Sequence, residues 1–109
     1  GGGVTVTLQW AASSATSGDA VWNAAFERIA NAGQDIDSDG FASAQTATAT
    51  ASGTSGVCVY TAITFTDGAQ MDSIAVGEAF RLKITRNAAA GGDTMAGDAE
   101  LLAVEVRES

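Results

Sequence analysis

The chain has 109 residues, which is the size of one domain with a single core. Its 13 acidic and 5 basic residues give a net charge of −8. This balance argues against partners such as nucleic acid or an anionic membrane surface, because both require clustered lysine and arginine. No run approaches the 18 apolar residues of a membrane helix, and we find no signal peptide pattern.

The sequence offers few groups for catalysis. Histidine is absent, which excludes the Ser-His-Asp and Cys-His arrangements and most zinc sites. No glycine-rich phosphate loop ends in Lys-Ser or Lys-Thr, and residues 1–56 contain one basic side chain, Arg28. An active site would have to consist of carboxylates alone. We therefore predict that the chain is not an enzyme and has no cofactor, apart from the weak calcium site considered below.

Five segments alternate apolar with polar or small residues, as strands with one buried face do. Turn-forming glycine, asparagine and aspartate residues separate them. This pattern predicts an all-β fold, an antiparallel β-sandwich or barrel. In chain order, the alternating segments are residues 4–10, 46–51, 57–65, 80–85 and 102–107.

Residues 20–30 do not alternate. Val21, Ala25 and Ile29 recur at helical spacing, and Trp22 and Phe26 adjoin the same face. Periodicity alone therefore favours a helix in this segment. Residues 69–75 are a second helical candidate, with one or two turns expected between two strands.

Residues 35–40 match the first half of a calcium loop. Asp35, Asp37 and Asp39 occupy positions 1, 3 and 5, and Gly40 occupies position 6. Position 12, which should hold a bidentate acid, is Thr46. Half of the motif favours an acidic turn between strands, and the alternative is a weak calcium site.

Three of the five positive charges lie in one segment. Arg81 and Lys83 alternate outward and are expected to face carboxylates such as Glu105 on a neighbouring strand. Arg86 keeps the register of the inward residues Leu82 and Ile84 of the same segment. Its position predicts a buried or interfacial ion pair.

Asp93 and Asp98 flank the turn before the last strand. Turn chemistry, in which aspartate side chains bond nearby backbone N–H groups, is the favoured interpretation. The alternative is a carboxylate pair that binds a sugar or a metal ion.

The two tryptophans are Trp10 and Trp22, and the single cysteine is Cys58. In a domain with so few aromatic residues, both tryptophans are expected in the core. A sugar-stacking platform is the alternative. Cys58 lies between Val57 and Val59 and is therefore interpreted as a small core or interface residue. A role as a nucleophile is not favoured, because no basic residue lies near it in the sequence to activate the thiol.

The core is predicted to be thin. Of 50 hydrophobic residues, 23 are alanine and only 26 carry large apolar side chains. A core of this size offsets an unusually small share of the conformational entropy lost on folding. Further apolar burial against other subunits is therefore expected.

The order of segments resembles a β-sandwich domain of tailed-phage virion proteins, found in capsid decoration proteins, head fibres and tail fibres. The residues that carry the resemblance are the opening GD-x-VW of SGDAVWNAAFERIA, the segment GEAFRLKITR and the closing DTMAGDAELLAVEV. It covers roughly residues 4–108 and contains no catalytic signature. The resemblance implies that residues 20–30 form a strand, against their periodicity.

The resemblance also implies a jelly-roll-like sandwich that assembles as a homotrimer. We accordingly expect a structural module in the virion, in contact with other phage proteins of the capsid or tail. Gly1–Gly3 are expected to be a linker or processing stub, followed by one domain over residues 4–109. The alternative is a carbohydrate- or receptor-binding module with exposed loops, weakly dependent on calcium.

The trimer interface is expected to consist of residues that alternate away from the domain's own core. Arg86 is expected to meet a carboxylate of a neighbouring subunit across the threefold axis. The other predicted interface residues are Cys58, Tyr60, Ala62, Leu101 and Ala103.

Overall fold

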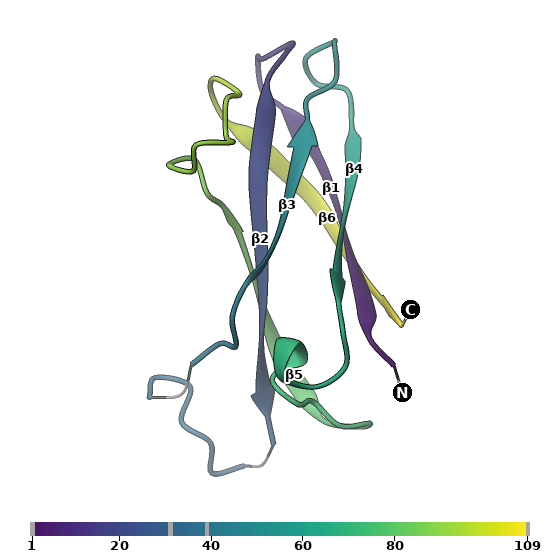
Figure 1. The fold of residues 1–109 in the computed structure, drawn as a ribbon, viewed down its shortest axis with the longest axis vertical. Helices are drawn as coiled ribbons and strands as arrows, with labels where there is room; N and C mark the ends of the chain where they lie inside the picture. The colour runs from purple at the N-terminus through teal and green to yellow at the C-terminus, as the bar shows by residue number, and fades with distance from the viewer. Residues whose placement is uncertain (1, 31, 39, 109) are drawn as a thin grey trace.

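The computed structural model describes residues 2–30, 32–38 and 40–108 (Figure 1). Within these residues the fold consists of strands and one short 3₁₀ helix, η1 (Ala69–Met71). The strands are β1 (Val4–Ala12), β2 (Asp19–Ile29), β3 (Gln45–Thr50), β4 (Val59–Phe65), β5 (Ala79–Arg86) and β6 (Ala99–Glu108).

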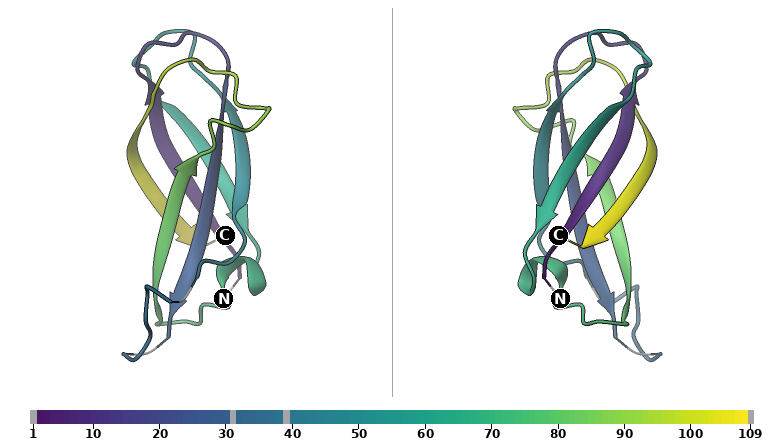
Figure 2. Two further views of the ribbon diagram at one scale, coloured as in Figure 1. Left: turned by 90° about the vertical axis from the view of Figure 1, so that its left-hand side faces the viewer. Right: turned by 90° about the vertical axis from the view of Figure 1, so that its right-hand side faces the viewer.

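The strands form two antiparallel sheets that pack face to face (Figure 2). One sheet has the order β4-β1-β6 and the other the order β3-β2-β5, so the first two strands of the chain are the two central strands. The predicted all-β, antiparallel β-sandwich is confirmed. The jelly-roll-like connectivity stays a prediction.

The core lies between the sheets and contains both tryptophans. The Trp10 and Trp22 rings, from opposite sheets, are buried with their centroids 5.7 Å apart. Trp10 Nε1 donates a hydrogen bond of 2.9 Å to Thr61 Oγ1 of β4, which satisfies its one polar atom. The predicted core role of the tryptophans is confirmed, and a sugar-stacking role is wrong because neither ring reaches the surface.

Residues 20–30 form a strand, as the resemblance implied and their periodicity did not. The inward face of β2 carries Trp22 and Phe26. Its outward face is also buried around Ala25 and Glu27, because the segment before β3 lies over their β5 neighbours: the Phe41 ring centroid is 4.8 Å from both Arg81 Cζ and Lys83 Nζ. Ala25 and Glu27 lie buried on this outward face. A strand buried on both faces loses the period of two, and here the result imitates a helix.

The helix predicted over residues 69–75 is shorter than expected. It ends at Met71, because Asp72 and Ser73 adopt left-handed φ angles of 52° and 55°. The Asp72 carboxylate accepts a hydrogen bond of 2.9 Å from the Arg28 N–H of β2. This contact holds the turn against the end of the strand.

One side of the sandwich is closed and the other is open. β3 contacts β4 along the closed side, whereas β5 and β6 stand apart on the opposite side (Figure 2). The strand β6 consequently has exposed residues along nearly all of its length. The alternation of residues 102–107 predicted one buried face, formed by Leu102, Val104 and Val106. This prediction is wrong, because no strand of the described chain covers this part of β6 and all three side chains are exposed.

Candidate functional site

The most prominent surface feature is the open side of the sandwich, which we define as Phe80 of β5 together with Leu101, Val104 and Val106 of β6. These side chains are 39–42% exposed. Val104 and Val106 pair with the buried Leu8 and Val6 of β1, so they continue the core layer to the surface. Apolar residues gathered in this way are typical of an interaction surface.

A register shift in the β1–β6 pair sets which side chains of β6 face inward. The shift lies between Gln9 and Trp10: Gln9 pairs with Ala103, and Trp10 pairs with Leu101. Leu102 is the extra residue, as in a β-bulge. Leu101 therefore shares the face of the core residue Trp10, and the prediction that it points away from the core together with Ala103 is wrong.

The other predicted interface residues on these strands lie on the outer face of the β4-β1-β6 sheet or next to it. Tyr60 is 68% exposed, and Cys58, Ala62 and Ala103 are also exposed. Tyr60 pairs with Gln9 and Ala62 with Thr7, so their outward neighbours are polar. The outer face around Tyr60 is therefore mixed, with small and polar side chains beside one large aromatic ring.

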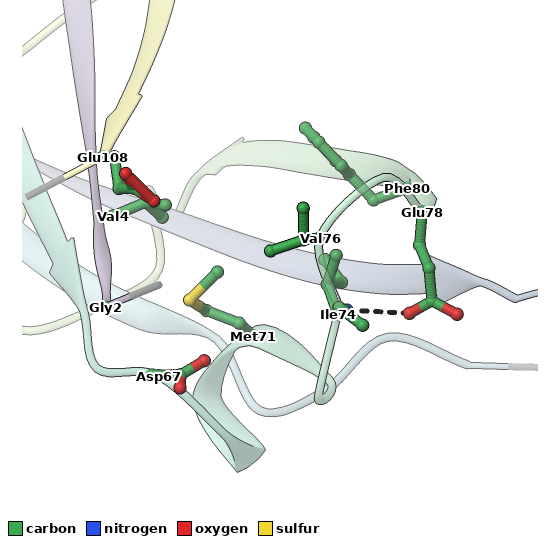
Figure 3. Close-up of a pocket in the computed structure, with 10 residues that line it drawn as sticks. Gly2, Val4, Asp67, Met71, Ile74, Val76, Glu78, Phe80 and Glu108 are labelled. Atoms are coloured by element: carbon green, nitrogen blue, oxygen red, sulfur yellow. Dashed lines mark hydrogen bonds between the residues drawn. The ribbon is translucent and has the colours of Figure 1, made fainter.

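A cavity of about 330 Å³ lies at the end of the open side where β5 begins and β6 ends (Figure 3). Its apolar wall includes Met71, Ile74 and Phe80, and Val76 beside them is 93% exposed. Asp67, Glu78 and Glu108 add carboxylates to the lining. Glu78 is occupied by its own ion pair with Arg28, at 2.8 Å.

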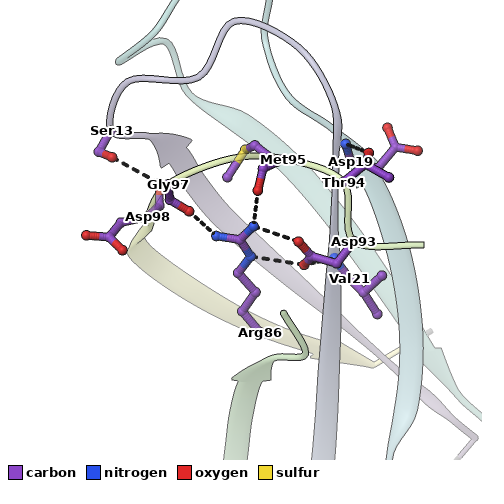
Figure 4. Close-up of polar contacts among 9 residues, drawn as sticks. All are labelled: Ser13, Asp19, Val21, Arg86, Asp93, Thr94, Met95, Gly97 and Asp98. Atoms are coloured by element: carbon purple, nitrogen blue, oxygen red, sulfur yellow. Dashed lines mark hydrogen bonds and ion pairs between the residues drawn. The ribbon is translucent and has the colours of Figure 1, made fainter. Parts of the chain in front are cut away.

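Arg86 forms its ion pair within its own chain (Figure 4). Its Nη2 and Nε lie 2.7 Å and 3.0 Å from the two carboxylate oxygens of Asp93. Nη2 also donates to the carbonyl of Met95, and Nη1 donates to the carbonyl of Gly97. The prediction of a carboxylate from a neighbouring subunit is therefore wrong, because the turn that follows β5 folds back over the guanidinium and supplies every contact.

The same turn is tied to the start of β2. Asp93 Oδ2 accepts from the Val21 N–H at 2.9 Å, and Thr94 Oγ1 accepts from the Asp19 N–H at 2.9 Å. The Asp93 side chain is only 2% exposed. Hydrogen bonding to Arg86 lowers the pKa of Asp93 and raises the pKa of Arg86. Asp93 is thus part of a structural clamp, and a free carboxylate pair with Asp98 is ruled out.

Arg81 pairs with a carboxylate on a different strand from the one expected. Its Nε donates to Glu27 Oε1 of β2 at 2.6 Å, whereas Glu105 lies on the other sheet beside Arg107. Glu27 is 1% exposed, and within the described chain its Oε2 has no hydrogen-bond partner. Sequence reasoning missed this buried carboxylate; the signal was an acidic residue directly after the apolar run Ala24–Phe26 of β2.

Residues 35–38 of the candidate calcium loop fold as the favoured acidic turn, which the Asp35 side chain closes. Asp35 Oδ1 accepts from the Asp37 N–H at 2.9 Å, and Asp35 Oδ2 accepts from the Ser38 hydroxyl at 3.1 Å. Both oxygens of the first candidate ligand thus already have donors. Asp39 lies outside the described residues. Within residues 2–30, 32–38 and 40–108, no three acidic or cysteine side chains gather in a way that could hold a metal ion.

We expect calcium to bind this loop with a dissociation constant no tighter than about 10⁻⁴ M, because Thr46 replaces the closing acid. Titration calorimetry with calcium chloride measures it, and Asp37→Ala is the matched variant. Micromolar binding that Asp37→Ala abolishes would contradict the interpretation as a turn.

No helix in the described parts of the chain has the length and apolar character to cross a membrane. Comparison with known protein families, curated proteins and solved structures finds no match to this chain.

Proposed function

We propose that this domain is a structural module of a bacteriophage particle, either a capsid decoration protein or a fibre domain, and that it acts by assembling as a homotrimer. The observation that carries the proposal is the number of large apolar side chains left at the surface. Among the described residues, nine of the 26 in the chain are exposed. They are Ile36, Val57, Tyr60, Val76, Phe80, Leu101, Leu102, Val104 and Val106.

A small domain gains stability when exposed apolar residues are buried between subunits. Four of these residues form the open side and Tyr60 lies on the outer face of the β4-β1-β6 sheet, so more than one contact with neighbouring molecules is available. Ile36, Val57 and Val76 lie in loops outside these two surfaces. In the proposed trimer, the outer face contributes Tyr60 with Cys58, Ala62 and Ala103. Other virion proteins are the further partners.

The assignment to a phage particle rests on the resemblance of GD-x-VW, GEAFRLKITR and DTMAGDAELLAVEV to virion β-sandwich domains. The β-sandwich fold is consistent with it. The alternative function, glycan binding, called for an exposed tryptophan, and both tryptophans are buried. No observation favours it over assembly.

The oligomeric state in solution tests the proposal. Light scattering at micromolar concentration is expected to give the mass of three chains of 10.9 kDa each. Tyr60→Asp is expected to reduce the mass to that of one chain, because it places three charges in the interface. Val76→Asp is the control: it adds the same charge at a 93% exposed site away from the outer face and is expected to leave the mass unchanged.

A stable monomer, or a mass that Tyr60→Asp and Val76→Asp change equally, would contradict the trimeric interface. The particle assignment has its own test, which is detection of this domain on purified virions by cryo-electron microscopy.

A further inference from the structure

We infer that the free edge of β6 pairs antiparallel with β6 of a second copy of this chain, so that two β4-β1-β6 sheets join into one continuous sheet. β6 has β1 along one edge, and no strand of the described chain lies along its other edge. The pairing would add a two-fold contact to the self-association proposed above. It does not depend on the phage assignment.

The edge of β6 lacks two of the features that normally prevent such pairing. Exposed edges are commonly protected by proline, by charged side chains, lysine above all, or by a bulge that twists the strand away. β6 contains neither proline nor lysine, and its one bulge, at Leu102, lies near its start. It does carry charges, which are Glu100, Glu105, Arg107 and Glu108. Residues 103–108 follow the bulge in regular register with β1 and present Val104 and Val106 at 39% exposure.

The charges on the outer face of β6 are self-complementary. Glu105 and Arg107 lie two residues apart on this face, opposite Thr7 and Thr5 of β1. Within the chain they form only a weak pair, 3.4 Å long, with side chains 52% and 74% exposed. Both groups are therefore available to a partner strand.

One register satisfies these charges. With a two-fold axis at Val106, Glu105 of each copy lies opposite Arg107 of the other, Val106 lies opposite itself, and Val104 lies opposite the stem of Glu108. An axis at Glu105 would place two Glu105 carboxylates opposite each other. An axis at Val104 would place Glu100 opposite Glu108. Charge complementarity therefore selects the register centred on Val106, and it identifies the partner as a second copy.

Charge reversal tests the contact in the full chain. Glu105→Arg and Arg107→Glu each replace two attractive pairs by two repulsive ones, and each is expected to raise the dissociation constant of the pair by about tenfold or more. The double variant Glu105→Arg/Arg107→Glu restores the attraction and is expected to restore association. Because both side chains are exposed, thermal unfolding of the variants is expected to match that of the parent chain at concentrations where both are monomeric.

Disulfide trapping tests the register. In a Cys58→Ser background, Val106→Cys places two cysteines opposite each other across the axis, within reach of a disulfide. Mild oxidation is expected to give a chain of twice the mass on a non-reducing gel. Val104→Cys is the control, because the same register places its two copies four residues apart along the strands, and no cross-link is expected.

The masses separate this inference from the trimer. A mass of two chains that Glu105→Arg abolishes supports the β6 pair and contradicts the trimer. A mass of three chains that Glu105→Arg leaves unchanged supports the trimer and overturns the β6 pair. A mass of six chains that Glu105→Arg reduces to three supports both contacts. A mass of one chain, or equal cross-linking of Val104→Cys and Val106→Cys, overturns the β6 pair.

Discussion

Asp93→Asn is expected to lower the free energy of unfolding by about 2–3 kcal/mol. The substitution removes the negative charge that pairs with Arg86 and leaves the half-buried guanidinium without a counter-charge. Removing one partner of a fully buried ion pair costs about 3–5 kcal/mol. The cost is lower here because Arg86 keeps the carbonyls of Met95 and Gly97 as acceptors. Denaturant titration measures the effect, and we expect the melting temperature to fall by roughly 10–15 °C.

The matched control is Asp98→Asn, which removes the same charge from an exposed residue that interacts with Arg86 only electrostatically. It is expected to cost less than about 0.5 kcal/mol. An equal loss of folding stability for Asp93→Asn and Asp98→Asn would contradict this interpretation. It would show that the stabilisation comes from net charge near Arg86 and not from the hydrogen bonds that Asp93 forms.

The contribution of the clamp depends on pH in a defined direction. Because Arg86 lowers the pKa of Asp93 in the folded chain, the stabilisation is complete above the unfolded value of 3.8. It is lost as the pH falls through the lower folded pKa. The difference in stability between the parent chain and Asp93→Asn is therefore expected to be constant near neutral pH and to shrink below about pH 4.

Phe26→Ala is expected to cost about 3–4 kcal/mol of folding stability. The Phe26 ring is buried between the sheets and meets the rings of Phe65 and Phe80 edge-on. Its ring centroid lies 4.8 Å from that of Phe65 and 5.3 Å from that of Phe80. Truncation leaves a cavity at the centre of the core. Denaturant titration with a constant m-value measures the loss.

The control for Phe26→Ala is Phe80→Ala, which removes the same group from the outer end of this ring cluster, next to Phe26. Phe80 is 42% exposed at the open side, and its loss is expected to cost about 1 kcal/mol in the monomer. Equal costs at the two positions would indicate that the open side is closed in solution.

The alternating segments were predictable because each has one covered and one exposed face. In β4, Thr61, Ile63 and Phe65 are buried, while Tyr60 and Ala62 are exposed. Alternation fails as a guide where that condition fails. Both faces of β2 are covered, which produced a helical pattern, and the far side of β6 is uncovered, which made its inward valines appear to belong to the core.

The errors at the candidate site have two causes, a local bulge in β6 and the order of the strands in the sheets. A single bulge at Leu102 reverses the face of Leu101, and period-two counting cannot detect an extra residue. The partners of Arg86 and Arg81 depend on which strands become neighbours. β5 lies beside β2, so Glu27 meets Arg81, and the turn after β5 brings Asp93 back to Arg86. Strand order is a property of the whole fold that local sequence does not encode.

The place of β1 at the centre of its sheet also determines how the chain folds. Its residues pair with β6 from Val4↔Glu108 to Ala12↔Ala99, so nearly the whole described chain forms the loop that this pairing closes (Figure 1). Such a high contact order places folding in the slow range of milliseconds to seconds. During synthesis, β1 leaves the ribosome before both of its partner strands, and β4 follows before β6. One edge of β1 therefore stays unpaired until the 10 residues of β6 have been added.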